Sequence, residues 1–481
     1  MSTRDDLIEA ARDHVESGAL RADLALAVAY PSVSSDPVGR DALGTYLDAV
    51  LRPRLEQLGC ELAYYDRWAE SGNAFLIGTR IEGLELPTVL LYGHADVVEG
   101  LDEQWTEGRS PWRLQVEGDR WYGRGTADNK GQHLINLAAL RLILDRRGAL
   151  GFNLKVLIEC GEEVGSPGLG EFATDHAELL SADVFIGSDG PRLDAETPTL
   201  FLGARGVVEF ALDVDLREGS HHSGNWGGLL RNPATTLAAA IACLVDGHGR
   251  IQIPSLLPAE LPASVRAALA GVVPARGLGD PIPDPDWGDR TLTAAERVYG
   301  WNTLEVLAMA SGDVTTPVGA IPGTARAVLQ LRFVTGTDTA DLQGAVQRHL
   351  DARGFGAVRV RTIAESLASR TDPDHPWVRW ASESVAETIG SPPAILPNIG
   401  GTLPNHVFES VLGLPTIWLP HSYPGCRQHA ANEHMLESIA EQGIRIACGL
   451  FQDLAHSRVP QAEPPTTDRS AASASRRPHE R

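Results

Sequence analysis

Four short apolar segments limit most strongly the folds that this chain can adopt. Each segment ends in polar or ionisable residues. Segments of this length that are apolar at nearly every position are typical of parallel strands buried on both faces, which alternate with helices in α/β proteins. A helical pattern, NKGQHLINLAALRLILDRRG, separates the first two. We therefore expect an α/β fold. The four segments read LPTVLLYGH, NLKVLIECGEE, ADVFIGSDG and LPTIWLPHS.

The residues before the first segment have a mainly helical pattern. The N-terminal stretch is charged and helix-like, and DALGTYLDAVLRPRLEQLG has the three- and four-residue apolar spacing of an amphipathic helix. Between them, YPSVSSDPVGR contains the Pro, Ser and Gly residues typical of a loop. The sequence thus predicts a helix, a loop and a second helix ahead of the first strand.

A second kind of pattern begins near residue 206. Apolar and polar residues alternate in GVVEFALDVDL, ARAVLQLRFV and VRVRTI, as in half-buried strands, and the helical patterns NPATTLAAAIACLVDG and DTADLQGAVQRHLDARG accompany them. A chain of 481 residues is long enough for two domains. We expect a catalytic domain at 1–205 and 372–458, an inserted α+β domain at 206–371, and a flexible tail at 459–481.

Acidic residues and histidines follow the predicted strands and begin the helix between the first two. Because ligands bind at the carboxyl ends of strands in open α/β sheets, these side chains are expected to converge on one crevice. So many buried carboxylates cannot all ionise without positive charge, and no cluster of Lys or Arg accompanies them. A pair of divalent metal ions is the economical source of that charge. The residues are His94, Asp96, Asp128, Glu162, Glu163, Asp189 and His429.

Composition disfavours several other classes of protein. The formal net charge of −22 argues against binding to nucleic acid. No run of about 18 apolar residues predicts a membrane-spanning helix, and the N-terminal stretch lacks the apolar core of a signal peptide. The five cysteines are scattered without CxxC spacing, which indicates neither a disulfide framework nor a zinc knuckle. We expect a cytoplasmic protein without a nucleic-acid or membrane partner.

Seven ordered motifs resemble those of the M20 family of dinuclear metallopeptidases, most closely its dipeptidase branch, which includes carnosinase-like enzymes. The resemblance implies a catalytic domain with a mixed, largely parallel sheet, an inserted lid and dimerisation domain, and a homodimer. It also implies hydrolysis of the peptide or amide bond of dipeptides or short peptide-like substrates through a metal-bridging water. The motifs are YGHADVV, GRGTADNKG, ECGEEVGS, GSDG, HHSGNWGG, GGTLP and PGCRQHAANEH.

The same resemblance implies two separate ligands for each of two divalent ions and one ligand that both ions share. Asp128 bridges the two ions, His94 and Asp189 complete the site of one, and Glu163 and His429 complete the site of the other. Zinc is the expected metal. Manganese and cobalt are alternatives, because mixed imidazole and carboxylate ligands suit all three metals.

The resemblance also implies catalytic roles for three further residues. Glu162 is the general base, which takes a proton from the water and passes it to the leaving amine. Asp96 orients His94 through its second ring nitrogen, and the two side chains share a side because strand side chains alternate. His222, in HHSGNWGG, steadies the oxyanion in the active site of the partner subunit.

The resemblance also bears on the substrate. Arg332 matches an arginine that grips the substrate carboxylate, and Thr402 stands where a serine usually lies beside the substrate. Aspartate at position 189 favours a substrate with a free α-amine. The chain departs from the family pattern at Gly319, where carnosinase-like members have threonine, and in QHAANEH, which is more often QHAPNEH.

Other interpretations stay open. Deacylation of an N-acyl amino acid or carboxypeptidase action is the second enzymatic hypothesis. A metal-dependent binding or scaffold protein is a third, although such a protein would not need Glu162. GRGTADNKG lacks the spacing of nucleotide-binding loops. A structural or dimer-contact role is the alternative for His222, and Cys160 and Cys426 are expected to pack rather than to bind metal.

Overall fold

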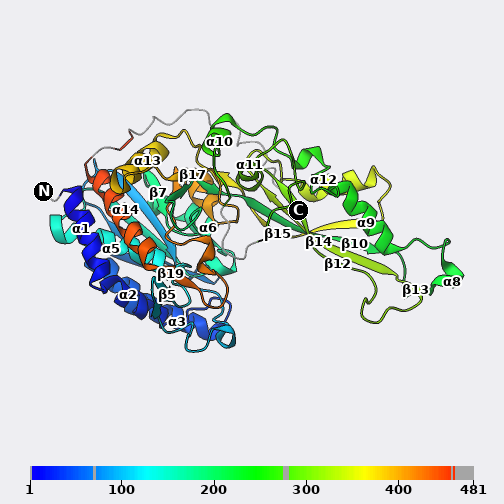
Figure 1. Ribbon diagram of the computed structural model, residues 1–481, viewed down its shortest axis with the longest axis horizontal. Helices are drawn as coiled ribbons and strands as arrows, with labels where there is room; N and C mark the ends of the chain where they lie inside the picture. The colour runs from blue at the N-terminus through cyan, green and yellow to red at the C-terminus, as the bar shows by residue number, and fades with distance from the viewer. Residues whose placement is uncertain (1–2, 69–71, 275–280, 457–458, 461–481) are drawn as a thin grey trace, which may run out of the picture.

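The computed structural model describes residues 3–68, 72–274, 281–456 and 459–460. Figure 1 shows a larger α/β body from which a narrower unit, built on a second sheet, extends to one side. None of the helices in the described ranges is both long and apolar enough to cross a membrane. The predicted tail lies outside the described residues from position 461 onward.

An eight-stranded sheet forms the centre of the body, in the order β1-β2-β6-β3-β7-β18-β8-β17. The four strands predicted from apolar segments are neighbours in it and run parallel to one another. All of their residues except Thr88 are buried, as expected for strands covered on both faces. They are β3 (Thr88–His94), β6 (Asn153–Glu159), β7 (Val184–Gly187) and β18 (Thr416–Trp418).

The outer strands make this sheet mixed. β2 (Asn73–Arg80) runs antiparallel to β6, and β1 (Glu61–Trp68) runs antiparallel to β2. Toward the opposite edge, β8 (Thr199–Phe201) is antiparallel to β18 and parallel to β17 (Ala394–Leu396). The predicted α/β class with a mixed, largely parallel sheet is confirmed.

The core of the body lies on both faces of the sheet. Val89 and Leu91 of β3 belong to one buried apolar cluster, whereas Leu90 and Tyr92 belong to another, because successive strand side chains point to opposite faces. The first cluster includes residues of α1 (Arg4–Glu16), α2 (Ala19–Val28), α5 (Lys130–Arg147), α13 (Pro376–Ile389) and α14 (Glu437–Ala455). The second includes residues of α6 (Leu169–Asp175), α7 (Ala177–Leu180), α10 (Ala263–Ala268) and α11 (Ala294–Tyr299).

The amphipathic helix before β1 begins earlier than its pattern suggested. α3 (Pro37–Tyr46) starts inside the predicted loop, because the Asp36 side chain caps the helix and Pro37 suits its first position. The helix continues through a π-helical turn (Leu47–Leu51) into α4 (Arg52–Gln57). The prediction of a loop was therefore wrong at its C-terminal end.

A four-stranded antiparallel sheet, in the order β12-β14-β10-β15, forms the centre of the narrower unit. The alternating patterns predicted β10 (Gly206–Asp215), β14 (Thr324–Phe333) and β15 (Val358–Ser366). The predicted helices are also present, as α9 (Pro233–Leu244) and α12 (Leu342–Asp351). They share an apolar cluster with the sheet. The edge strand β12 (Thr303–Ala310) was not predicted.

Two neighbouring chain segments join the ends of the second sheet to the body. β9 (Gly203–Ala204) leads into β10, and β16 (Ser369–Arg370) follows β15. These two short strands pair with each other in the antiparallel direction. The domain limits at 206 and 371 stay a prediction. The other short strands and the short helix α8 are β4 (Gln115–Glu117), β5 (Arg120–Tyr122), β11 (His221–His222), α8 (Ser223–Trp226), β13 (Ala320–Ile321) and β19 (His434–Leu436).

Candidate metal centre

His94 ends β3 and is completely buried. Its Nδ1 lies 3.0 Å from the backbone oxygen of Asp96 and 3.4 Å from Oδ1 of the same residue. A proton on Nδ1 is therefore donated to the Asp96 carbonyl, which leaves Nε2 available to a metal ion. Asp96 is the residue predicted to orient this ring. The shorter contact runs through the main chain of Asp96.

Asp128 lies between two histidines. Its Oδ1 is 3.0 Å from Nε2 of His94, and its Oδ2 is 3.1 Å from Nε2 of His429. Asp189, shortly after β7, lies 3.4 Å from the same nitrogen of His94. Glu163 lies 3.0 Å from the same nitrogen of His429. Two pairs, each a histidine and a carboxylate, thus share Asp128, and the histidine of each pair contacts a different oxygen of it.

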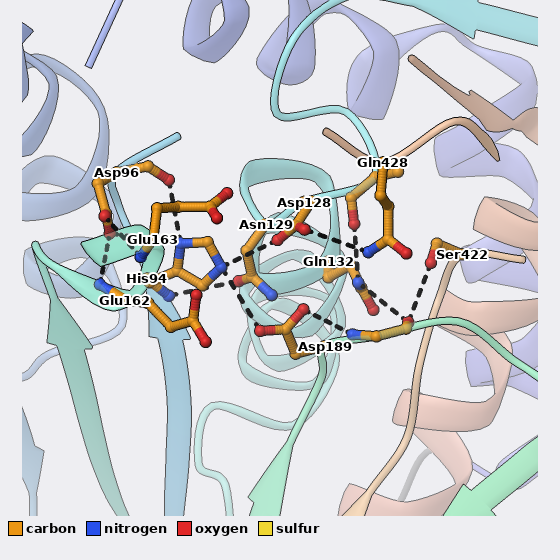
Figure 2. A network of polar contacts seen from close by, with 12 residues as sticks. His94, Asp96, Asp128, Asn129, Gln132, Glu162, Glu163, Asp189, Ser422 and Gln428 are labelled. Atoms are coloured by element: carbon orange, nitrogen blue, oxygen red, sulfur yellow. Dashed lines mark hydrogen bonds and ion pairs between the residues drawn. The ribbon is translucent and has the colours of Figure 1, made fainter. Parts of the chain in front are cut away.

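Figure 2 shows side chains from separate elements turned into one space at the carboxyl ends of the strands. His94 comes from the end of β3, Glu163 from the turn after β6, and Asp128 from the turn before α5. Ligand atoms of these three residues all lie within 4.8 Å of one another. The structure therefore brings the predicted residues together. Their assignment as metal ligands stays a prediction.

Burial and like charge shift the acid–base properties of these carboxylates. Burial raises the pKa of Glu163 to about 7 and that of Glu162 well above its usual value. Burial and the charge of Asp128 raise the pKa of Asp189. Although burial acts on Asp128 in the same direction, hydrogen bonds from two histidines outweigh it and lower the pKa of Asp128. Crowded acids with raised pKa values mark a place where additional positive charge would be stabilising.

The residues of this centre fit divalent cations. Their side chains offer carboxylate oxygens and imidazole nitrogens, which zinc, manganese and cobalt all accept. Oε1 of Glu163 is buried and has no hydrogen-bond partner among the described residues. The Nζ of the nearby basic residue Lys130 donates to the backbone oxygens of Ala27 and Tyr30 and not to a carboxylate of the centre.

The Asp96 carboxylate holds the turn that carries the two adjacent glutamates. Its two oxygens accept hydrogen bonds from the backbone N–H groups of Glu162, at 3.2 Å, and Glu163, at 3.1 Å. Gly165, with a φ of 90°, ends this turn in a conformation that glycine adopts without strain. The two glutamate side chains diverge: Glu163 reaches His429, whereas the Glu162 carboxylate lies below the ring of His94 in Figure 2.

His222 lies apart from this centre within its own chain. It belongs to β11, its side chain is exposed, and its Nδ1 accepts a hydrogen bond from the N–H of Gly224 at 3.1 Å. Figure 1 places the adjoining helix α8 at the far end of the narrower unit. The structure therefore does not bring His222 together with the other predicted residues.

Arg332 and Thr402, predicted to contact substrate, lie against each other. Nη1 of Arg332, on β14, donates to Oγ1 of Thr402 at 2.6 Å. The Thr402 hydroxyl in turn donates to the backbone oxygen of Arg205 at 3.0 Å. The Arg205 guanidinium donates through Nε and Nη2 to the backbone oxygen of Gly400. These bonds join the second sheet to the GGTLP loop, and the two substrate-binding roles stay predictions.

Sequence reasoning missed Glu433, which is buried and contacts the backbone at Asp128. It lies inside PGCRQHAANEH, only four positions after the predicted ligand His429. The one available signal was an acidic residue within a motif full of polar groups. A sequence does not reveal that such a carboxylate is buried, nor which backbone groups it meets.

Carboxylates and imidazoles gathered at the carboxyl ends of strands in an α/β body define a metal-dependent hydrolase. The chain belongs to the peptidase family M20/M25/M40, whose family model matches residues 90–453. The resemblance inferred from the motifs is thereby confirmed. The protein is a peptidase of this family, in which dinuclear metal binding is described for a Bacillus subtilis member.

Individual relatives extend the likeness along most of the chain. The cysteinylglycine-S-conjugate dipeptidase of Corynebacterium striatum is 30% identical over 365 residues, which are 73% of this chain and 76% of that protein. Human carnosine dipeptidase 1 superposes with a TM-score of 0.73 at 21% identity and covers 95% of this chain and 99% of its own. The metallo-carboxypeptidase Sso-CP2 of Sulfolobus solfataricus has a TM-score of 0.76 at 24% identity, covering 91% and 99%. At these identities the two structures support the fold alone.

Proposed function

We propose that this protein hydrolyses the peptide or amide bond of dipeptides and short peptide-like substrates with two divalent cations. The observation that carries the proposal is the pair of Asp128 oxygens, each of which contacts a different histidine that in turn contacts a further carboxylate. His94 and Asp189 would hold one ion, Glu163 and His429 the other, and Asp128 both. Zinc is the first candidate, followed by manganese and cobalt.

Bound divalent ions supply a Lewis acid for the substrate carbonyl and lower the pKa of a coordinated water to about 7. Glu162 takes a proton from the attacking water and delivers it to the amine that leaves. Its position supports this role, because its backbone N–H is bonded to Asp96 and its carboxylate faces the same space as Asp189. Burial raises the pKa of Glu162, which favours a carboxylate that must accept a proton.

Arg332 would bind the α-carboxylate of the substrate, and Thr402 would steady the arginine. The 2.6 Å hydrogen bond between them supports this arrangement, because it leaves further N–H groups of the guanidinium to donate. Asp189 and the dipeptidase relative of Corynebacterium striatum favour substrates with a free α-amine. The likeness to a metallo-carboxypeptidase keeps carboxypeptidase or deacylase action as the second candidate.

A substrate panel separates these two candidates. The protein, reconstituted with zinc, manganese or cobalt, is given free dipeptides, the same dipeptides with an acetylated N-terminus, and N-acyl amino acids. We expect kcat/KM for free dipeptides to exceed that for their acetylated forms by at least about tenfold, because a missing charge contact at a binding site typically costs that much. Faster cleavage of the acylated compounds would contradict the dipeptidase assignment and support the alternative.

We also propose a homodimer formed through the narrower unit. The edge strand β12 exposes Val306, Leu307 and Met309, and apolar side chains in a row on an outer strand are typical of a contact surface. A dimer would also explain the distance of His222 from its own centre, because the residue would then serve the partner's. Sedimentation of the active enzyme tests this point, and a fully active monomer would rule it out.

A cytoplasmic location remains part of the proposal. All five cysteines are free. Four of them are buried in the body without forming a disulfide: Cys60, Cys160, Cys426 and Cys448. This state suits a reducing compartment. Fractionation of cells that express the protein, followed by immunodetection, tests the assignment.

A further inference from the structure

Glu433 is a buried carboxylate that reaches the backbone beside Asp128. Its Oε1 accepts hydrogen bonds from the N–H groups of Ala127, at 2.9 Å, and Asp128, at 3.1 Å. Its Oε2 accepts a hydrogen bond from Nη1 of Arg124 at 2.6 Å. Both charged side chains are buried, so the charge of the glutamate is balanced by the arginine and not by contact with water.

Glu433 contacts the backbone at Asp128 in the same way as Asp96 contacts the backbone at the two adjacent glutamates. Asp96 accepts hydrogen bonds from the successive N–H groups of Glu162 and Glu163. Glu433 accepts them from the successive N–H groups of Ala127 and Asp128. In both cases a buried carboxylate is turned toward the backbone of a segment that carries a proposed ligand.

The Glu433 contacts also join three segments that are distant in sequence. Its backbone oxygen accepts a hydrogen bond from the N–H of Gly123 at 3.0 Å. Nε of Arg124 donates to the backbone oxygen of Glu99 at 3.1 Å, in the segment that follows His94. Glu433 itself lies in the loop that carries His429. The buried pair of Glu433 and Arg124 therefore contacts chain segments that carry proposed ligands of both ion sites.

We propose that Glu433 is a positioning residue: its hydrogen bonds to the N–H groups of Ala127 and Asp128 fix the backbone there and so set the direction of the bridging carboxylate, while Arg124 neutralises its charge. Glu433 does not itself bind metal. The inference rests on the proposed dinuclear centre. Residues that orient ligands in this way typically contribute about 10–100-fold to metal affinity or activity.

Glu433→Gln is the direct test, because every group that Glu433 contacts is a donor. An amide offers one oxygen and one NH₂ group, so the NH₂ of glutamine must face either Arg124 or the two backbone N–H groups. We expect Co²⁺ affinity, measured by competition with a chromogenic chelator, to fall about 10–100-fold. The visible absorption spectrum of the Co²⁺-loaded protein should also change, since it reports the geometry of the ligands.

Glu296→Gln is the matched control. Glu296 is likewise buried, accepts a hydrogen bond from a backbone N–H, that of Thr293, and pairs with an arginine, Arg266. It lies on α11, away from the proposed ligands in sequence. We expect its replacement to lower the thermal midpoint of the metal-free protein while leaving Co²⁺ affinity and spectrum as in the wild type.

Glu433→Gln combined with Arg124→Met restores the geometry in part. With the arginine gone, the NH₂ group meets no opposing donor and the amide oxygen can again accept from both N–H groups. We expect the double variant to regain most of the lost Co²⁺ affinity and a spectrum close to that of the wild type. If the single variant does not fold, the double variant carries the test, and an altered Co²⁺ spectrum in that folded protein would overturn the inference.

The outcomes distinguish this inference from the proposed function. Wild-type protein that binds no Co²⁺ would refute the dinuclear centre itself. Wild-type protein that binds two ions, together with a folded Glu433→Gln variant of equal affinity and identical spectrum, would refute only the positioning role. Loss of affinity and a changed spectrum in Glu433→Gln, recovery in the double variant and no change in Glu296→Gln would support it.

Discussion

Nε2 of His429 lies 3.1 Å from Oδ2 of Asp128, although 301 positions separate the two residues along the chain. The whole second sheet lies between them in the sequence. The centre is therefore assembled from both halves of the body. Its geometry depends on how those halves pack, not on any local motif alone.

Replacement of Asp128 by alanine should remove both metal ions, because each proposed ion site uses one of its oxygens. His429→Ala should remove one ion and leave the other with His94 and Asp189. Elemental analysis after dialysis gives the number of ions per chain. Asp128→Ala protein that still retains two ions would show that this carboxylate does not bridge them.

Glu162→Gln should leave metal content unchanged and lower kcat by about 10²–10⁴-fold, the usual contribution of general acid–base catalysis. The amide has nearly the same shape but does not accept the proton from water. Metal content and kcat are measured on the same preparation. Loss of metal along with activity would mean that Glu162 is a ligand, and full activity would remove it from the mechanism.

Metal binding should release protons and strengthen with rising pH. In the metal-free protein, hydrogen bonds to Asp128 and Glu163 raise the pKa of His429 to about 11, so its ring is protonated at neutral pH. An ion binds only the deprotonated nitrogen. Raising the pH toward that value removes the competing proton, and affinity should rise about tenfold per pH unit for each proton released. Calorimetric titration with Zn²⁺ in buffers of different ionisation enthalpy counts these protons; a count of zero would contradict the ligand assignment of His429.

Mixed dimers test the role of His222 in the partner's centre. His222→Ala and Glu162→Gln chains should each be nearly inactive alone. Coexpressed in equal amounts, they should recover about a quarter of wild-type activity, because half of the dimers are mixed and each has one intact centre. A mixture as inactive as its components would show that His222 does not act across a dimer.

The four central strands could be predicted because their burial is reflected in the local pattern of apolar residues. β3, β6, β7 and β18 are rich in apolar residues because both faces of the sheet are covered, and the polar residues His94 and Asp189 lie at or just beyond strand ends. The expected convergence of these side chains followed from their positions at strand ends and from the motifs.

Features that depend on residues distant in the sequence could not be predicted from it. The exposed apolar residues of β12 follow neither the alternating nor the fully buried pattern. The antiparallel direction of β1 and β2 depends on connections and not on side-chain periodicity. The carboxylate of Glu433 owes its surroundings to Arg124 and to a backbone more than 300 positions away. No local pattern encodes such a contact.

β18 occupies the place between β7 and β8, although it is made after the entire second sheet. On the ribosome, β7 and β8 therefore emerge with a gap between them, and one edge of β7 stays unpaired until residues 416–418 are synthesised. The four-stranded sheet is complete before then and is free to fold first, as domains generally do during translation. For that interval the nascent body presents an open strand edge, the kind of template that favours aggregation and that chaperones shield.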